Sequence, residues 1–207
     1  MTATPANRLL RPVILRVPAN AADLSRPERV RYLSDLARQA LRRSAGLSGL
    51  TLGALEKDEH GGPIPSGGVF WSLTHKPRYA AGVASRTPVG IDIETVRPVR
   101  EGMYRKVAGA AEWALGQGDR LETFFRFWTA KEAVLKTGGR GLADLSACRV
   151  VAVSDADRLS VRYRGRIWRV RQCRFDDHMA AVAGGEAGVD WALPSPENES
   201  VSSLTPS

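Results

Sequence analysis

The chain has 207 residues, of which 43% are hydrophobic, and a formal net charge of +8. This is enough apolar material for one large domain or two small ones that share a core, and the charge favours an anionic partner: a polyphosphate, an acidic protein, nucleic acid or an acidic membrane. Two cysteines are too few for a disulfide framework, no apolar stretch could span a bilayer and the N-terminus lacks a secretory pattern, so we expect a soluble cytoplasmic protein.

The N-terminal half begins with an alternating apolar pattern that predicts a strand over residues 9–17. A helical period follows from residue 26 to about residue 44, and the opposite face of that helix is rich in arginine. Residues 46–68 hold many glycines and prolines and predict a loop. Three short strands are expected next, at residues 69–74, 79–85 and 89–94.

The C-terminal half is predicted to be helical from residue 101 to residue 137. Its longest helix begins at Gly118 or Asp119 as the N-cap and ends before two glycines at 138 and 139. Strands are then expected at residues 149–153, 159–163, 166–174 and 178–183. The end of the chain, 186–207, is rich in proline, serine and glutamate and predicts a disordered tail.

Two small-residue segments, at 79–84 and 179–184, resemble each other about a hundred residues apart. They indicate an internal duplication in which each segment closes one half of a two-lobed fold. The alternative is coincidence, since the match is short.

A pair of carboxylates marks the strand expected at 89–94. Side chains alternate along a strand, so Asp92 and Glu94 share one face while Ile91 and Ile93 enter the core. Two carboxylates this close favour a bound cation, and oxygen ligands favour magnesium or manganese over zinc. The alternative is an ordinary strand with one acidic, solvated face.

The long helix carries a second charged cluster. Trp128, Glu132 and Lys136 form one stripe at a spacing of four residues, and Lys131 lies about 100° round the helix, close enough to reach the same site. A third carboxylate with two lysines suits a metal-bound polyphosphate. The alternative is a surface ion pair of Glu132 and Lys136 beside a core tryptophan.

A third group of polar residues ends the strand expected at 69–74. Thr74, His75 and Lys76 offer a hydroxyl, an imidazole and an ammonium, all of which can bind phosphate. A purely structural histidine is the alternative.

In this order the motifs resemble those of the 4'-phosphopantetheinyl transferases, specifically the larger, surfactin-synthetase-activating type. The resemblance rests on Gly62-Pro63, Thr74-His75, the Gly-Ile-Asp-Ile-Glu strand at 90–94, and the helix from Trp128 to Lys136 with the glycine-rich segment at 139–142. It implies an α/β (α+β) fold with a pseudo-two-fold axis: two similar lobes, each with a small sheet and a long helix. We place the lobes at residues 1–88 and 89–185, in a chain expected to be a monomer.

The resemblance also implies an activity. The enzyme would move the 4'-phosphopantetheine arm of coenzyme A to a serine of an apo acyl or peptidyl carrier protein, with Mg²⁺ (or Mn²⁺) as cofactor, and release 3',5'-ADP. Such enzymes serve fatty-acid, polyketide or nonribosomal peptide synthesis. No membrane or nucleic-acid partner is expected.

The residue roles it implies are as follows. Asp92, Glu94 and Glu132 would be the metal ligands. Glu132, or a metal-bound water beside it, would be the base, and Lys131 would lie at the reacting centre. The residues facing coenzyme A would be Gly62, Pro63, Thr74, His75 and Lys136, with Arg38 or His75 at the 3'-phosphate.

Three positions depart from the family pattern. Gly62 stands where a basic residue is common, Thr74 where serine is usual, and Val107 where an aromatic residue is common. Two other functions remain open from the residues alone: a magnesium-dependent nuclease, and a non-catalytic basic domain that binds nucleic acid.

Overall fold

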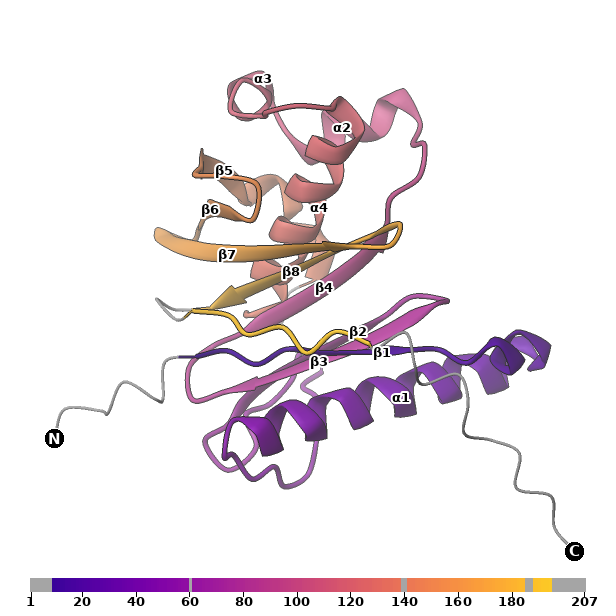
Figure 1. The fold of residues 1–207 in the computed structure, drawn as a ribbon. Helices are drawn as coiled ribbons and strands as arrows, with labels where there is room; N and C mark the ends of the chain where they lie inside the picture. The colour runs from indigo at the N-terminus through magenta and orange to yellow at the C-terminus, as the bar shows by residue number, and fades with distance from the viewer. Residues whose placement is uncertain (1–8, 60, 139–140, 185–187, 195–207) are drawn as a thin grey trace, which may run out of the picture.

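The computed structural model describes residues 9–59, 61–138, 141–184 and 188–194. It contains two antiparallel sheets, each with a long helix on one side (Figure 1). The N-terminal sheet has the order β1-β3-β2, and the C-terminal sheet has the order β4-β8-β7-β6-β5. The predicted mixed α/β class is therefore confirmed.

The strands and helices have the following bounds. The N-terminal sheet and its helices comprise β1 (Val13–Arg16), η2 (Ala19–Asp23), α1 (Arg26–Leu47), β2 (Phe70–His75) and β3 (Tyr79–Ser85). The remainder comprises β4 (Gly90–Thr95), α2 (Glu101–Val107), α3 (Ala110–Trp113), α4 (Arg120–Lys136), η3 (Gly141–Ala147), β5 (Arg149–Val153), β6 (Arg158–Tyr163), β7 (Arg166–Phe175) and β8 (His178–Gly184).

The two halves repeat one topology. Each has a first strand, a long helix and a hairpin, and the second strand of the hairpin pairs with the first strand: β1, α1, β2 and β3 in one half, β4, α4, β7 and β8 in the other. The two similar small-residue segments of the sequence are β3 and β8, and every residue of both strands is buried. The fold thus has the predicted two-lobed arrangement, while the exact division between residues 88 and 89 stays a prediction.

Local sequence determines where the long helices begin. Glu28 accepts hydrogen bonds from the backbone N–H and hydroxyl of Ser25 at the start of α1, and the Asp119 carboxylate accepts one from the N–H of Glu122 at the start of α4. Asp119, one of the two predicted N-caps, is therefore the N-cap of α4. At its other end α4 stops at Lys136 with Thr137 as the C-cap, just before Gly138, the first glycine of the predicted stop; residue 139 lies outside the described residues.

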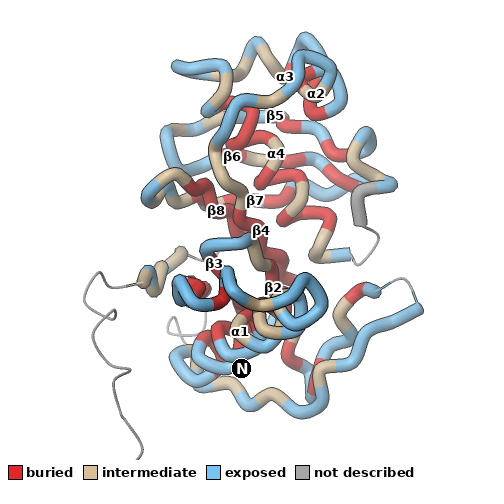
Figure 2. The backbone as a smooth tube through the Cα atoms, turned by 90° about the vertical axis from the view of Figure 1, so that its right-hand side faces the viewer, coloured by how far each residue is buried: buried red, intermediate tan, exposed pale blue. Residues whose placement is uncertain are grey.

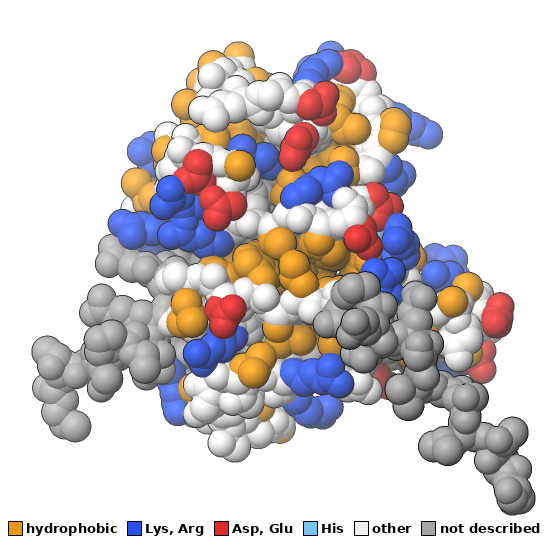
Figure 3. Space-filling model, in the orientation of Figure 1, with side chains coloured by type: hydrophobic (Ala, Val, Ile, Leu, Met, Phe, Trp, Pro, Cys, Tyr) orange, Lys and Arg blue, Asp and Glu red, His pale blue; other side chains and the backbone are white. Residues whose placement is uncertain are grey.

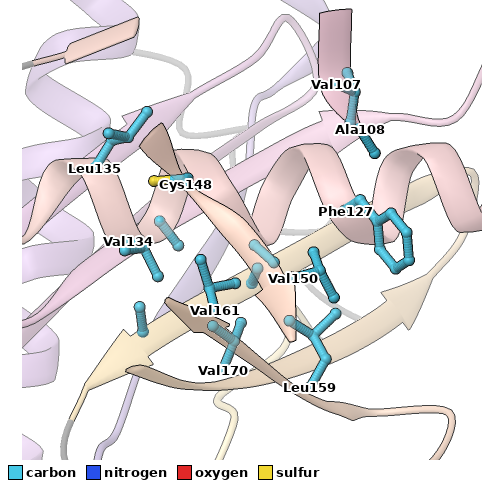
Figure 4. Packing of buried hydrophobic residues seen from close by; sticks show 14 of the residues in the cluster. Val107, Ala108, Phe127, Val134, Leu135, Cys148, Val150, Leu159, Val161 and Val170 are labelled. Carbon is cyan, nitrogen blue, oxygen red and sulfur yellow. The ribbon is translucent and has the colours of Figure 1, made fainter. Parts of the chain in front are cut away.

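The larger core lies between α4 and the C-terminal sheet. Figure 4 shows Phe127, Val134 and Leu135 of α4 beside apolar side chains of β5, β6 and β7. Cys148 is fully buried in the same cluster, and it and Cys173 are both free thiols. Figure 2 shows this buried region continuing from α4 into β4 at the centre of the molecule.

A second core joins the two sheets. Ile91 and Ile93 of β4 and Ala180 and Val182 of β8 face Ile14, Tyr79, Ala81 and Val83 of the N-terminal sheet. The strand alternation predicted for β4 is confirmed on this side.

The end of the described chain returns to the N-terminal sheet. Leu10 pairs with Val189 and Val13 pairs with Ala192 in isolated parallel β-bridges. Trp191 packs against the core between the sheets. Residues 188–194 therefore lie along β1, which the prediction of a disordered tail over 186–207 did not anticipate; residues 186–187 and 195–207 lie outside the described chain. Among the described helices, none has the length and apolarity needed to cross a membrane.

Candidate active site

Asp92 lies at the point where β4, β2 and the end of α4 meet. Its side chain is buried, and its Oδ1 accepts hydrogen bonds from Lys136 Nζ (2.8 Å) and Thr74 Oγ1 (3.2 Å). Lys136 Nζ also donates to the carbonyl of Ile91 (3.0 Å). The other carboxylate oxygen of Asp92, Oδ2, is buried and has no partner among the described residues. An unpaired buried anionic oxygen is costly, so this atom is suited to an external ligand.

Glu94 is held in the same way, two residues further along the same face of β4. Its Oε1 accepts a hydrogen bond from Lys76 Nζ (2.7 Å) and another from the indole N–H of Trp128 (3.0 Å). Lys76 follows the last residue of β2, and Trp128 lies on α4, one turn before Glu132. Each carboxylate therefore bonds one lysine and one neutral donor.

A close approach of β4 to α4 brings these groups together. Gly90 packs so tightly on the last turns of α4 that a Cβ there would collide with the carbonyl oxygen of Ala133. On the other side, the N–H of Ile91 donates to Ser72 Oγ in β2 (3.2 Å). Glycine at the start of the Gly-Ile-Asp-Ile-Glu strand is thus required by packing.

Glu132 faces the same cluster from α4. Burial raises the pKa of its carboxyl to about 7, the negative charges of Asp92 and Glu94 add to the rise, and Lys136 opposes it. The three predicted metal ligands therefore lie close enough to interact electrostatically.

The bonding of the carboxylates determines how well the cluster fits a cation. Within the described residues, no set of three histidine, cysteine, aspartate or glutamate side chains is arranged to hold a metal ion as it stands. In this state Lys76 Nζ bonds one oxygen of Glu94 and Lys136 Nζ bonds one oxygen of Asp92. The free Oδ2 of Asp92 and the excess negative charge around Glu132 nevertheless suit a divalent cation with oxygen ligands.

Lys131 does not join this cluster, so the expectation that it reaches the same site is wrong. Its Nζ binds Glu112 Oε1 (2.6 Å) and the carbonyl of Val107 (2.5 Å), and its side chain is only 1% exposed. The step of about 100° around α4 separates Lys131 from Glu132 and turns it towards the segment that holds α2 and α3.

The residues predicted to face coenzyme A divide into two groups. Thr74 and Lys136 bond Asp92 directly. His75 alternates away from Thr74, onto the side of β2 where Trp71 and Leu73 pack with α1. Burial lowers the pKa of His75, and the positive charges of Lys136, Lys76 and Lys57 lower it further.

Gly62 and Pro63 lie in the loop that also carries Lys57. The N–H of Gly62 donates to Asp58 Oδ1 (2.7 Å), and Pro63 forms an isolated antiparallel β-bridge with Lys57. Arg38 lies on α1 and pairs with Asp35 (3.1 Å); none of its contacts within the described chain joins it to the carboxylates. The charge of Lys57 lowers the pKa of His75, so this loop acts electrostatically on His75. Arg38 has no such link to the carboxylates of the site.

The sequence predicted a phosphate-binding group at Lys76 but not its bond to Glu94, and it assigned no site role to Lys57 or to the indole N–H of Trp128. Lys76 had a usable signal, because it stands two residues after Thr74 and so points the same way along the strand. The indole of Trp128 lies on the predicted stripe with Glu132 but was read only as core. Lys57 had no signal, since the loop geometry decides where it points.

Known proteins resemble this chain in the region of the site. A family model for the 4'-phosphopantetheinyl transferase superfamily matches residues 88–183, from just before β4 to the end of β8. This segment contains Asp92, Glu94, Glu132 and Lys136. Residues 88–183 are thus similar to the 4'-phosphopantetheinyl transferase superfamily, the family that the motifs of the chain resemble.

Several curated relatives carry the same name. The 4'-phosphopantetheinyl transferase psf-1 of Bacillus pumilus is 34% identical over 84 residues, which is 39% of this chain and 35% of that protein. HetI of Nostoc sp. is 30% identical over 132 residues, or 60% of this chain and 54% of the relative. The enzyme named gsp of Aneurinibacillus migulanus is 27% identical over 90 residues, or 42% and 38%. The chain thus matches about a third to a half of the length of these relatives.

Proposed function

We propose that this protein transfers 4'-phosphopantetheine from coenzyme A to a serine of an apo acyl or peptidyl carrier protein and releases 3',5'-ADP. The observation that supports this most directly is the meeting of Asp92, Glu94 and Glu132 with the ammonium groups of Lys76 and Lys136. Carboxylates that hold a cation and lysines that hold phosphate are the parts a phosphoryl transfer needs.

The same proposal extends to the state of the protein. Both halves contribute to one site in a single chain, which favours a monomer. Two free thiols favour a reducing compartment such as the cytoplasm.

Asp92, Glu94 and Glu132 would hold the magnesium or manganese ion. When bound, the ion supplies charge neutralisation on the diphosphate of coenzyme A. Thr74 and Trp128 hold one oxygen of Asp92 and of Glu94 in place through hydrogen bonds, and the second oxygen of Asp92, which has no partner among the described residues, would bind the ion.

Glu132 is suited to accept the proton of the carrier serine. Without a cation, burial and the neighbouring carboxylates raise the pKa of its carboxyl to about 7. A cation held by the same cluster would lower that pKa and keep Glu132 ionised, the form that accepts a proton. Lys136, at the last turn of α4, would bind an oxygen of the leaving phosphate. Lys131 takes no part in this step, because Glu112 and Val107 bind its ammonium.

The nucleotide end of coenzyme A would lie beside His75. The positive charges of Lys136, Lys76 and Lys57 act on this imidazole, and a positive potential suits the binding of a phosphate group. The loop with Gly62 and Pro63 would pass along the adenine. Arg38 is the weaker of the two predictions for the 3'-phosphate, since it lies apart on α1 and pairs with Asp35.

The test is incubation of the protein with coenzyme A, Mg²⁺ and an apo carrier protein, followed by the intact mass of the carrier. The wild type should add one phosphopantetheine group. Asp92→Asn, which keeps the size but removes the charge, should lower the rate by at least about 100-fold. Asp23→Asn, at an exposed carboxylate remote from the site, is the matched control and should retain the rate.

Two outcomes would contradict the proposal. Wild-type rates in Asp92→Asn at limiting Mg²⁺ would remove Asp92 from the ligands. An unmodified carrier, together with Mg²⁺-dependent cleavage of nucleic acid, would favour the nuclease. In Figure 3 the lysines and arginines form several separate groups on the visible face, interrupted by acidic side chains, which argues against a continuous nucleic-acid track.

A further inference from the structure

Lys76 has a bond that phosphate binding alone does not explain. Its Nζ lies 2.7 Å from Glu94 Oε1, while its backbone N–H donates to the carbonyl of Tyr79 (2.7 Å) in the turn between β2 and β3. The turn therefore fixes the backbone of Lys76. The side chain is 31% exposed and free to change rotamer without moving that turn.

Lys136 makes the equivalent bond on Asp92 from the other half of the molecule. Its Nζ lies 2.8 Å from Asp92 Oδ1, and its side chain is 27% exposed, against 4% for Asp92. In both pairs the carboxylate is the more buried member and the lysine is nearer to solvent. The ammonium groups are thus the members that can leave.

The lysines and a divalent ion compete for the same carboxylates, because all of them are positively charged. Three carboxylates, Asp92, Glu94 and Glu132, face two ammonium groups. A divalent cation added to this arrangement would make the cluster positive and place like charges side by side. The ammonium groups need an anion elsewhere before the ion can bind well.

We propose that Lys76 is a positioning residue: together with Lys136 it serves as a replaceable counter-ion that holds the carboxylates until a divalent cation binds, and then moves onto the oxygens of the diphosphate. This inference rests on the proposed function. Its consequence is that cation and diphosphate bind cooperatively, because each removes the obstacle to the other, and such coupling is reciprocal.

The test measures cation binding directly, without turnover. Mn²⁺ is titrated into the protein, free Mn²⁺ is followed by electron paramagnetic resonance, and the titration is repeated with saturating coenzyme A and no carrier protein. In the wild type, coenzyme A should tighten Mn²⁺ binding by about 10-fold or more, within the usual range of coupling between two sites.

Lys76→Met removes the ammonium group and keeps a side chain of similar length. It should bind Mn²⁺ alone about 5-fold more tightly than the wild type, and coenzyme A should then tighten binding less. Lys76→Gln should behave in the same way. Lys106→Met, at an exposed lysine on α2, is the matched control and should leave both titrations unchanged. A poorly folded variant would bind less Mn²⁺, so tighter binding cannot come from unfolding.

Different results would contradict the counter-ion role of Lys76 and the proposed transferase function. If Lys76→Met and Lys76→Gln bind Mn²⁺ alone no more tightly than the wild type, the counter-ion role is wrong, whatever coenzyme A does. If coenzyme A does not bind to the wild type with Mn²⁺ present, the proposed function is wrong, while the titration with Mn²⁺ alone still decides the role of Lys76.

Discussion

At the scale of single residues, Lys131 and Glu132 are neighbours on α4 with different surroundings. Glu132 faces Asp92 and Glu94, whereas Lys131 is almost fully buried against Glu112. Burial alone would raise the pKa of Glu112, but hydrogen bonds from Lys131 and from the backbone N–H groups of Gly109 and Val150 lower it. Burial lowers the pKa of Lys131, and Glu112 opposes that shift. The pair is therefore a buried ion pair that joins α4 to the segment before it.

This role predicts a loss of stability when one partner is removed. Lys131→Met should cost about 3–5 kcal/mol, because it leaves the buried Glu112 carboxylate with only the more exposed Arg149 as a counter-charge. The double variant Lys131→Met with Glu112→Gln should lose less than the sum of the two single changes. Urea unfolding of the four proteins measures this cycle, with Lys106→Met as an exposed control expected within about 0.5 kcal/mol of the wild type. Additive effects would contradict a direct pair.

At the scale of secondary structure elements, the site depends on how closely β4 lies to α4. Gly90 permits this approach, and Gly82 permits the equivalent approach of β3 to α1, where a Cβ would collide with the backbone of Leu41. Each sheet thus has one glycine pressed against its long helix. At Gly90, a small shift of β4 would move Asp92 and Glu94 away from Glu132.

Gly90→Ala should therefore damage both fold and site. The added methyl group must displace the carbonyl of Ala133, and overpacking of this kind costs about 1–3 kcal/mol or more. Gly46→Ala is the matched control, because Gly46 lies in α1 with open space around it, and the change should stabilise the protein by about 0.5–1 kcal/mol. Thermal unfolding and Mn²⁺ binding measure the two effects. Retained Mn²⁺ affinity in a folded Gly90→Ala protein would show that the close approach is not needed.

The same elements show what the sequence could and could not predict. Alternation in β4 correctly placed Ile91 and Ile93 in the core and Asp92 and Glu94 on the opposite face, because strand geometry is local. The strand expected at 9–17 is shorter as β1, since Pro12 has no N–H for the sheet.

Long-range contacts explain the failures. Lys131 was misplaced because its direction depends on Glu112, which the sequence separates by 19 positions and a change of element. Similarly, the ordered segment at 188–194 depends on pairing with β1 at the far end of the chain. The composition of this segment predicts a disordered tail, because composition carries no information about pairing with a strand far away in the sequence.

At the scale of the whole molecule, a polar cluster closes one end of the interface between the two sheets. His178 of β8 is fully buried, with Nε2 3.0 Å from Thr95 Oγ1 and Nδ1 2.7 Å from Asp177 Oδ1. Its ring meets Tyr79 of β3 edge-on, and the hydroxyl of Tyr79 donates to Asp176. Arg16 and Arg78 lie over the Tyr79 ring. The cluster ties the β7–β8 turn to the N-terminal sheet.

This cluster makes the joint between the sheets sensitive to acid. Burial lowers the pKa of His178, with Arg78 acting in the same sense and Asp177 and Asp176 opposing it. Below about pH 6.5 the unfolded chain binds a proton there that the folded chain does not, so stability is present above that pH and is lost as the pH falls towards the folded pKa.

His178→Gln should flatten this dependence of the melting temperature between pH 7.5 and 5.5. His75 contributes in the same sense, and Glu132, whose pKa is raised to about 7, contributes in the opposite sense, so the comparison is between variant and wild type at each pH. A difference of 1 kcal/mol corresponds to about 2–4 °C in a chain of this size, which calorimetry in metal-free buffer resolves. The variant should also melt lower at pH 7.5, because Thr95 and Asp177 lose their hydrogen bonds to the imidazole. Parallel pH profiles for the two proteins would show that His178 carries none of the acid sensitivity of this interface.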